Sequence, residues 1–309
     1  MATLLLHHSA FAAHRTAPGH PERPDRYRAV EAALSRPEFD ALLRETAEPA
    51  ELAAARYVHT NRYVDALEAA RPERGYVYLD GGDTMMEPST WEAALRGVGA
   101  TLRAVDQVLA GEVQNAFVAC RPPGHHAETE RAMGFCLFNN ISIGARHAQR
   151  KHGLMRVAIV DFDVHHGNGT QQIFYADPSV LYASTHQMPL FPGTGAARET
   201  GAGNIFNAPL APGDGGAELR AAFTDRILPA LHAFSPELII VSAGFDAHER
   251  DPLGSLTMTT DDFAWVTREL MKSAETLCDG RLVAVLEGGY DLQALADSVT
   301  AHVGELVKG

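Results

Sequence analysis

The sequence has few cysteines and no long hydrophobic run, and both absences limit what the protein can be. Its 309 residues include three cysteines, Cys120, Cys136 and Cys278, and no Cys-x-x-Cys pair. A disulfide scaffold and a cysteine zinc finger are therefore excluded, and a reducing compartment is indicated. No apolar run approaches the ~20 residues of a membrane helix. Leu4–Leu6 is followed at once by His7, without a basic segment before it, so we expect no export signal and a cytoplasmic protein.

Positive charge is also scarce. The chain has 26 Lys and Arg against 39 Asp and Glu, a formal net charge of −13. This balance argues against nucleic acid as a partner and favours cationic substrates. At 46% hydrophobic residues, a chain of this length can bury a large core without disulfides.

Short apolar runs alternate with helical patterns along the whole chain. Val157–Val160 and Leu238–Val241 are apolar at every position, which is typical of parallel strands covered by helices on both faces. The predicted strands are Thr3–Ser9, Asn115–Cys120, Arg156–Asp163, Val180–His186, Glu237–Asp246 and Arg281–Gly289. The predicted helices are Ser89–Ala110, Asn139–His152, Ala217–Phe234, Thr260–Leu277 and Asp291–Val307. No linker or repeat interrupts this rhythm, so we predict one α/β domain over residues 1–309.

Polar residues collect where the predicted strands end, at the edge where parallel sheets bind ligands. Asp161, Asp163 and His165 share one face of an extended strand by period-two alternation, which predicts a metal site. Asp246 ends another strand and is a candidate for the third of about three ligands that catalytic zinc needs. The alternatives are a solvated loop with a helix cap and, for Asp246, a cap or turn residue.

Two further clusters follow predicted strands. His125 and His126 come after a Pro-Pro-Gly turn, and imidazole is well suited to proton transfer near neutral pH. Tyr290 follows Gly288 and Gly289, and its hydroxyl is a candidate donor to an oxyanion. A chance histidine pair and a packed aromatic ring are the alternatives. The sequence contains no Walker loop, no GxSxG elbow and no HExxH motif.

These motifs, taken together, resemble one family. The chain contains, in order, RPPGHHAE (121–128), GFCLFNN (134–140), DFDVHHGNGT (161–170), SAGFDAHERDPLG (242–254) and LEGGYD (286–291). The combination resembles the zinc-dependent histone deacetylase family in its broad sense, which includes bacterial deacetylase-like amidohydrolases and acetylpolyamine amidohydrolases. The similarity is greatest to the class II-like branch and extends from His20 nearly to the C-terminus. It implies a single arginase-like α/β domain with a mostly parallel sheet of about eight strands flanked by helices.

The resemblance also implies roles for individual residues. Three would bind one zinc ion: Asp163, His165 and Asp246. Three would be catalytic: His125, His126 and Tyr290. Asp161 would orient His125 and, with the Ser184 hydroxyl, face a structural potassium ion.

Further positions match the substrate path of the family. Gly134, Phe135 and Phe191 correspond to the acyl-lysine tunnel, and Arg26 to an internal acetate-release channel. Asp83 corresponds to a rim aspartate that holds the substrate backbone.

One position departs from part of the family. Asn168 stands where some members have an aspartate beside the second tandem histidine, and an amide orients that ring without adding charge. Asparagine here is common in the class II-like branch, so activity is still expected.

Three functions are compatible with these residues. The first is hydrolysis of acetyl-lysine in protein or peptide, which releases acetate and free amine. The second is hydrolysis of a small acetylated amine or foreign amide, such as an acetylpolyamine. Leu253, at the gatekeeper position, and the short stretch Met188–Gly203 favour the first over the second. The third, a binding module that holds a metal without catalysis, requires the loss of a catalytic residue, and all are present.

Overall fold

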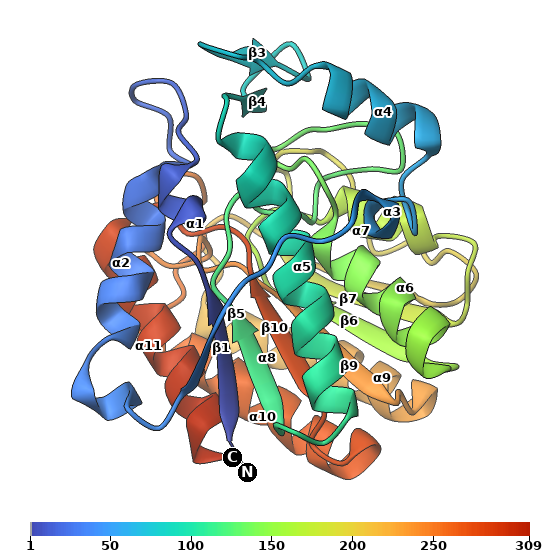
Figure 1. Cartoon of the computed structure of the whole chain (residues 1–309). Helices are drawn as coiled ribbons and strands as arrows, with labels where there is room; N and C mark the ends of the chain where they lie inside the picture. The colour runs from blue at the N-terminus through green and yellow to red at the C-terminus, as the bar shows by residue number, and fades with distance from the viewer. Residues whose placement is uncertain (1) are drawn as a thin grey trace.

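The computed structural model describes residues 2–309 and is built around one sheet of eight strands. All neighbouring strands in it are parallel, which confirms the predicted α/β fold (Figure 1). In spatial order the strands are β2 (Leu43–Thr46), β1 (Thr3–His7), β5 (Asn115–Val118), β10 (Leu282–Leu286), β9 (Leu238–Ala243), β6 (Val157–Asp161), β7 (Val180–Gln187) and β8 (Ile205–Leu210). The central strands β5, β10, β9 and β6 are buried at every residue, as their continuous apolar runs require.

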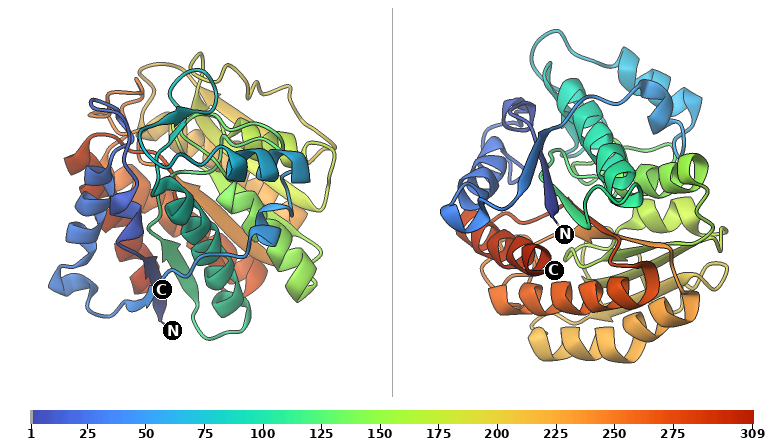
Figure 2. Two further views of the ribbon diagram at one scale, coloured as in Figure 1. Left: turned by 45° about the horizontal axis from the view of Figure 1, so that its top comes forward. Right: turned by 60° about the horizontal axis from the view of Figure 1, so that its bottom comes forward.

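Helices cover both faces of this sheet (Figure 2). One face carries α5 (Thr90–Leu109), α6 (Asn140–His152) and α7 (Asn168–Phe174). The other carries α2 (Pro24–Leu34), α8 (Gly216–Ala222), α9 (Leu228–Phe234), α10 (Thr260–Cys278) and α11 (Leu292–Lys308). The shorter elements are α1 (Ala10–Ala13), η1 (Pro37–Phe39), α3 (Leu52–Ala55), α4 (Asn61–Ala69), the π-helical η2 (Phe223–Ile227) and the hairpin of β3 (Val77–Tyr78) and β4 (Met85–Met86). No helix within residues 2–309 is both long enough and apolar enough to cross a bilayer.

The two edge strands are those that the sequence pattern did not predict. β2 carries exposed and charged side chains, so it lacks the apolar signature of a buried strand. β8 contains Pro209 near its C-terminal end. Proline is tolerated there because an edge strand has one side without a ladder partner.

The predicted helices are present, with two local differences. The segment Ala217–Phe234 is divided into α8, η2 and α9, and Pro229, which has no N–H, lies in the first turn of α9. Ser89 does not cap α5, because its hydroxyl donates to Ala13 O at 2.7 Å and lies against Glu87.

Candidate active site

Three side chains with metal-binding atoms meet at the carboxyl edge of the sheet. Asp163, His165 and Asp246 each place a ligand atom within 4.8 Å of the other two, and all three are buried. His165 Nδ1 lies 3.1 Å from Asp163 Oδ1 and 3.1 Å from Asp246 Oδ2. The prediction that Asp163 and His165 share one face of a strand is wrong, since β6 ends at Asp161 and the next residues form a turn. The turn, not a strand face, brings Asp163 and His165 together.

Backbone groups fix the two carboxylates. Gly288 N donates to Asp163 Oδ2 at 2.8 Å, and Val164 N donates to Asp246 Oδ1 at 2.8 Å. Glycine is required beside them, because a Cβ on Gly244 would lie 2.1 Å from Asp163 Oδ2 and one on Gly288 would lie 2.1 Å from Asp246 Oδ2. The absence of side chains at Gly244 and Gly288 therefore leaves room for the two carboxylates, and this space is called the cradle below.

The charge at this cradle suits a cation. Burial, together with the charge of Asp163, raises the pKa of Asp246 to about 7. Two buried carboxylates so close together are costly without positive charge between them. Two carboxylate oxygens and one imidazole nitrogen form the donor set of a catalytic zinc site with an open position. The residues present therefore fit a zinc ion.

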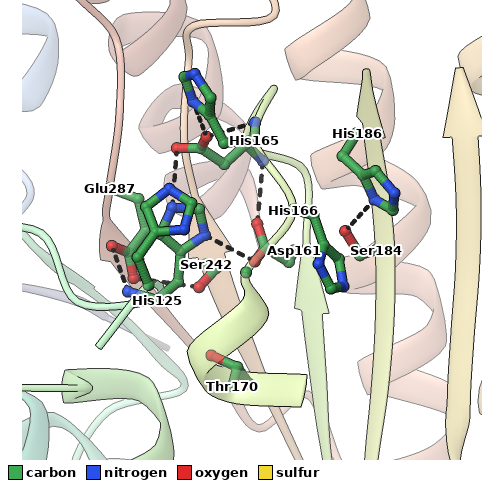
Figure 3. Close-up of polar contacts among 12 residues, drawn as sticks. His125, Asp161, His165, His166, Thr170, Ser184, His186, Ser242 and Glu287 are labelled. Atoms are coloured by element: carbon green, nitrogen blue, oxygen red, sulfur yellow. Dashed lines mark hydrogen bonds and ion pairs between the residues drawn. The ribbon is translucent and has the colours of Figure 1, made fainter. Parts of the chain in front are cut away.

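The tandem histidines lie beside this cluster with their rings 4.0 Å apart, and each has its own partner. His125 Nδ1 lies 3.0 Å from Asp161 Oδ2 (Figure 3), whereas His126 Nδ1 lies 2.8 Å from Asn168 Oδ1. Asn168 Nδ2 donates to Glu128 Oε1 at 2.7 Å, which turns the amide oxygen toward His126. His126 Nδ1 must then carry the hydrogen, and Nε2 keeps its lone pair.

The surroundings separate the two histidines electrostatically. Although burial opposes it, the carboxylates of Asp161, Asp163 and Glu287 hold the pKa of His125 well above its ordinary value. Burial, together with His125 and His165, holds the pKa of His126 well below its ordinary value. His125 is thus suited to remain protonated, and His126 is suited to accept a proton.

Tyr290 lines the same cavity as His126 and is 9% exposed. Burial holds the pKa of its phenol well above its ordinary value, so the hydroxyl stays a hydrogen-bond donor. The Arg26 guanidinium lies 4.8 Å from the ring centroid. Tyr290 N donates to Asp251 Oδ2 at 2.6 Å, and Asp251 Oδ1 accepts from Leu253 N at 3.0 Å. One carboxylate therefore positions both the tyrosine and the predicted gatekeeper.

These groups open into one cavity of ≈300 Å³. Its lining comprises Pro21, Asp83, His126, Gly134, Phe135, His165, Leu190, Phe191, Leu253 and Tyr290. The structure thus brings the predicted rim and tunnel residues to the predicted catalytic ones. A larger hollow of ≈380 Å³ near α10 and α11 is lined by two glutamates and three cationic side chains and, among the described residues, by no histidine or cysteine. It therefore lacks the imidazole groups that the first cavity offers for proton transfer or metal binding.

Several predicted positions do not line the cavity wall, and Arg26 and Ser184 lie farther into the protein. Arg26 is fully buried behind Tyr290, where its Nε donates to Gly289 O at 2.6 Å and it pairs with Glu22. It is absent from the lining of the cavity as the structure describes it. Ser184, the register partner of Asp161, has its hydroxyl 2.8 Å from His186 Nδ1 (Figure 3). The potassium ion stays a prediction.

Several buried charged residues near the site were not predicted. Glu287 Oε2 accepts from Gly124 N at 2.6 Å and His125 N at 3.2 Å, and Oε1 accepts from the Ser242 hydroxyl at 3.2 Å (Figure 3). Arg121 forms a buried ion pair with Glu22. Both residues could have been identified from their place in the motifs, because Glu287 lies within LEGGYD and Arg121 is the first residue of RPPGHHAE.

Comparisons with known proteins agree with this geometry. The model of the histone deacetylase domain family matches residues 20–306. "Histone deacetylase 10, chloroplastic" of Oryza sativa subsp. japonica is 41% identical over 310 residues, which cover 93% of this chain and 70% of the rice protein. A "Probable deacetylase" of Archaeoglobus fulgidus is 40% identical over 310 residues, 95% of this chain and 82% of its own length.

A bacterial relative and a solved structure are similar as well. The "Histone deacetylase-like amidohydrolase" of Pseudomonas aeruginosa is 40% identical over 280 residues, 89% of this chain and 73% of that protein. The crystal structure of the HDA15 HD domain superposes with a TM-score of 0.94 at 38% identity, and covers 100% of this chain and 89% of that chain.

Proposed function

Because the chain belongs to the histone deacetylase domain family, we propose that it is a zinc-dependent deacetylase that hydrolyses acetyl-lysine in proteins or peptides to acetate and free amine. The coarser statement, that it is a hydrolase of amide bonds, follows from the family itself. The observation that carries the finer proposal is that His165, which clusters with Asp163 and Asp246, lines one cavity together with His126 and Tyr290.

Asp163, His165 and Asp246 would hold the zinc ion. Bound there, zinc would act as a Lewis acid on the amide carbonyl and lower the pKa of water. A donor set with two carboxylates is more anionic than three imidazoles, and it weakens that acidity, so a nearby base gains importance. The base must therefore come from the side chains beside the cradle.

His126 is the proposed base and then the proposed acid. Its free Nε2 would accept a proton from the attacking water and return that proton to the departing amine nitrogen. His125, paired with Asp161, would keep its proton and stabilise the negative charge that develops beside it. Tyr290 would donate its hydroxyl hydrogen to the oxyanion formed from the carbonyl oxygen.

The cavity wall supports a lysine-like substrate. Phe135 and Phe191 are apolar side chains suited to the methylene stem of lysine, and Leu253 places no carboxylate at the mouth. Asp83 is the one acidic residue in the described lining, and a peptide N–H is a natural donor to it. A polyamine has no peptide backbone to use this acceptor, and its second ammonium would face Leu253.

The test is a direct comparison of substrates. The zinc-loaded protein is assayed for kcat/KM on an acetyl-lysine peptide, acetylputrescine, acetylspermidine and a simple acetanilide. We expect the peptide to give the highest value. A higher value for either acetylpolyamine or the anilide contradicts the peptide proposal and favours the small-molecule function. The same assays on Asp246→Ala, which lacks a proposed zinc ligand, measure any activity from contaminating enzymes.

A further inference from the structure

A second cluster of metal-binding side chains lies outside the active site, where α5 and α6 pack side by side (Figure 1). Asp106 comes from the last turn of α5, and His147 and His152 come from the C-terminal half of α6. α6 leads into β6 and α5 leads into β5, so their C-terminal ends lie at the sheet edge where the strands begin. The cluster is therefore at the opposite edge of the sheet from Tyr290.

The three side chains converge on one point. His147 Nε2 lies 2.8 Å and His152 Nε2 lies 2.6 Å from the same atom, Asp106 Oδ1. The three ligand atoms all lie within 4.8 Å of one another. Tetrahedral ligands about 2.0–2.1 Å from zinc are about 3.3 Å apart, so small side-chain rotations would admit an ion. Two imidazoles and one carboxylate suit zinc or a similar divalent transition ion.

The local electrostatics also favour a cation. The C-terminal ends of α5 and α6 both carry partial negative charge, and Asp106 adds a full negative charge in the last turn of α5. An aspartate there is unfavourable unless positive charge balances it. Lys151 Nζ, 2.8 Å from Asp106 Oδ2, supplies some of this balance, but its side chain is 56% exposed and free to move aside.

Packing fixes the position of the His147 ring beside Asp106. It is 6% exposed and stacks on Tyr57, with a centroid distance of 6.4 Å and an interplanar angle of 18°. Among the described residues its Nδ1 has no hydrogen-bond partner, and Nε2 is the ring nitrogen that points to Asp106.

We propose that Asp106, His147 and His152 bind a second zinc ion that clamps the ends of α5 and α6 together. This site is independent of the proposed function, since no residue of it lies in the catalytic cavity. The competing interpretation is a hydrogen-bonded cluster, in which the two imidazoles donate to Asp106 and no metal is bound.

The stoichiometry of zinc distinguishes the two interpretations. The zinc-loaded protein is titrated with zinc chloride by calorimetry, and bound zinc per chain is measured by elemental analysis after dialysis into a fixed free zinc concentration. We expect two equivalents in the wild type and one in His152→Gln, with affinity for the second ion reduced at least about tenfold. His232→Gln, an exposed histidine on α9, is the matched control and should keep both equivalents.

Asp106→Asn separates a metal ligand from a hydrogen-bond acceptor. Its amide oxygen still accepts from the imidazoles, so a hydrogen-bonded cluster would survive, whereas the anionic ligand is lost. We expect this variant to bind one equivalent and to lose the rise in Tm that added zinc causes in the wild type. Asp246→Ala should lose the active-site ion and keep this one, so failure at either site is distinguishable. One equivalent in the wild type, or two in Asp106→Asn, overturns the proposal.

Discussion

At the scale of the residue, Tyr290 is the side chain whose chemistry can be removed with the least structural change. Tyr290→Phe deletes only the hydroxyl and leaves the backbone contact with Asp251 and the ring packing on Arg26. We expect kcat to fall about 10²–10³-fold, because one oxyanion donor is lost. Metal content and Tm should match the wild type. Turnover near that of the wild type would assign Tyr290 a packing role only.

Leu253 is the residue at which substrate choice can be changed. It lines the cavity and is held there by Asp251, so a longer acidic side chain would reach the mouth. Leu253→Glu should shift the ratio of kcat/KM toward acetylspermidine and away from the acetyl-lysine peptide, because the carboxylate would pair with a distal ammonium. Leu253→Gln is the uncharged control. An equal shift in both variants would point to size instead of charge.

At the scale of the element, the start of α11 connects helix stability to the site. Asp291 caps this helix by accepting from Ala294 N at 2.8 Å, one residue after Tyr290. Asp291→Ala should lower the free energy of unfolding by about 1 kcal/mol in urea titrations, since the N-terminal amide loses its acceptor. Asp291→Asn keeps an acceptor and should lose less. If both variants unfold alike, the loss comes from the exposed Arg250 ion pair instead.

At the scale of the whole molecule, buried neutral histidines make stability depend on pH. His302 is 1% exposed, and burial lowers its pKa to about 3. Its Nδ1 donates to Thr267 Oγ1 at 2.7 Å, since the threonine hydroxyl itself donates to Phe263 O. In the unfolded chain its pKa returns to about 6.5, so between these values the unfolded state binds the extra proton. The stability that neutral His302 contributes is complete above pH 6.5 and is lost as pH falls toward 3.

The measurement is the slope of the unfolding free energy between pH 6 and 4. His302→Leu should reduce this slope by about 1.4 kcal/mol per pH unit relative to the wild type, because one proton is removed from the difference. His232→Gln, with an exposed histidine, should leave the slope unchanged. Equal slopes in the wild type and His302→Leu would mean that His302 is charged in the folded protein.

Features that depend on neighbours along the chain can be read from the amino-acid sequence alone. The apolar runs predict the central strands because a strand buried on both faces must be apolar at every position. The helix ends at Gly111 and Gly153 follow from local backbone preference, and both glycines have positive φ (71° and 73°). The motif residues Asp163 and Asp246 were identifiable because burying a carboxylate directly after an apolar strand costs free energy unless a cation or a hydrogen-bond donor stabilises it.

Contacts between groups that are distant in the chain depend on how the elements pack. Asp163 and Asp246 are brought together by the pairing of β6 with β9, and Glu287 reaches the backbone of His125 from the end of β10. Asp106 and His152 are far apart in the chain and touch because α5 packs on α6. The edge strands β2 and β8 also needed the assembled sheet, since β2 is charged and mostly exposed and β8 is interrupted by Asn207 and Pro209. Such contacts depend on packing between elements, which periodicity within one element does not encode.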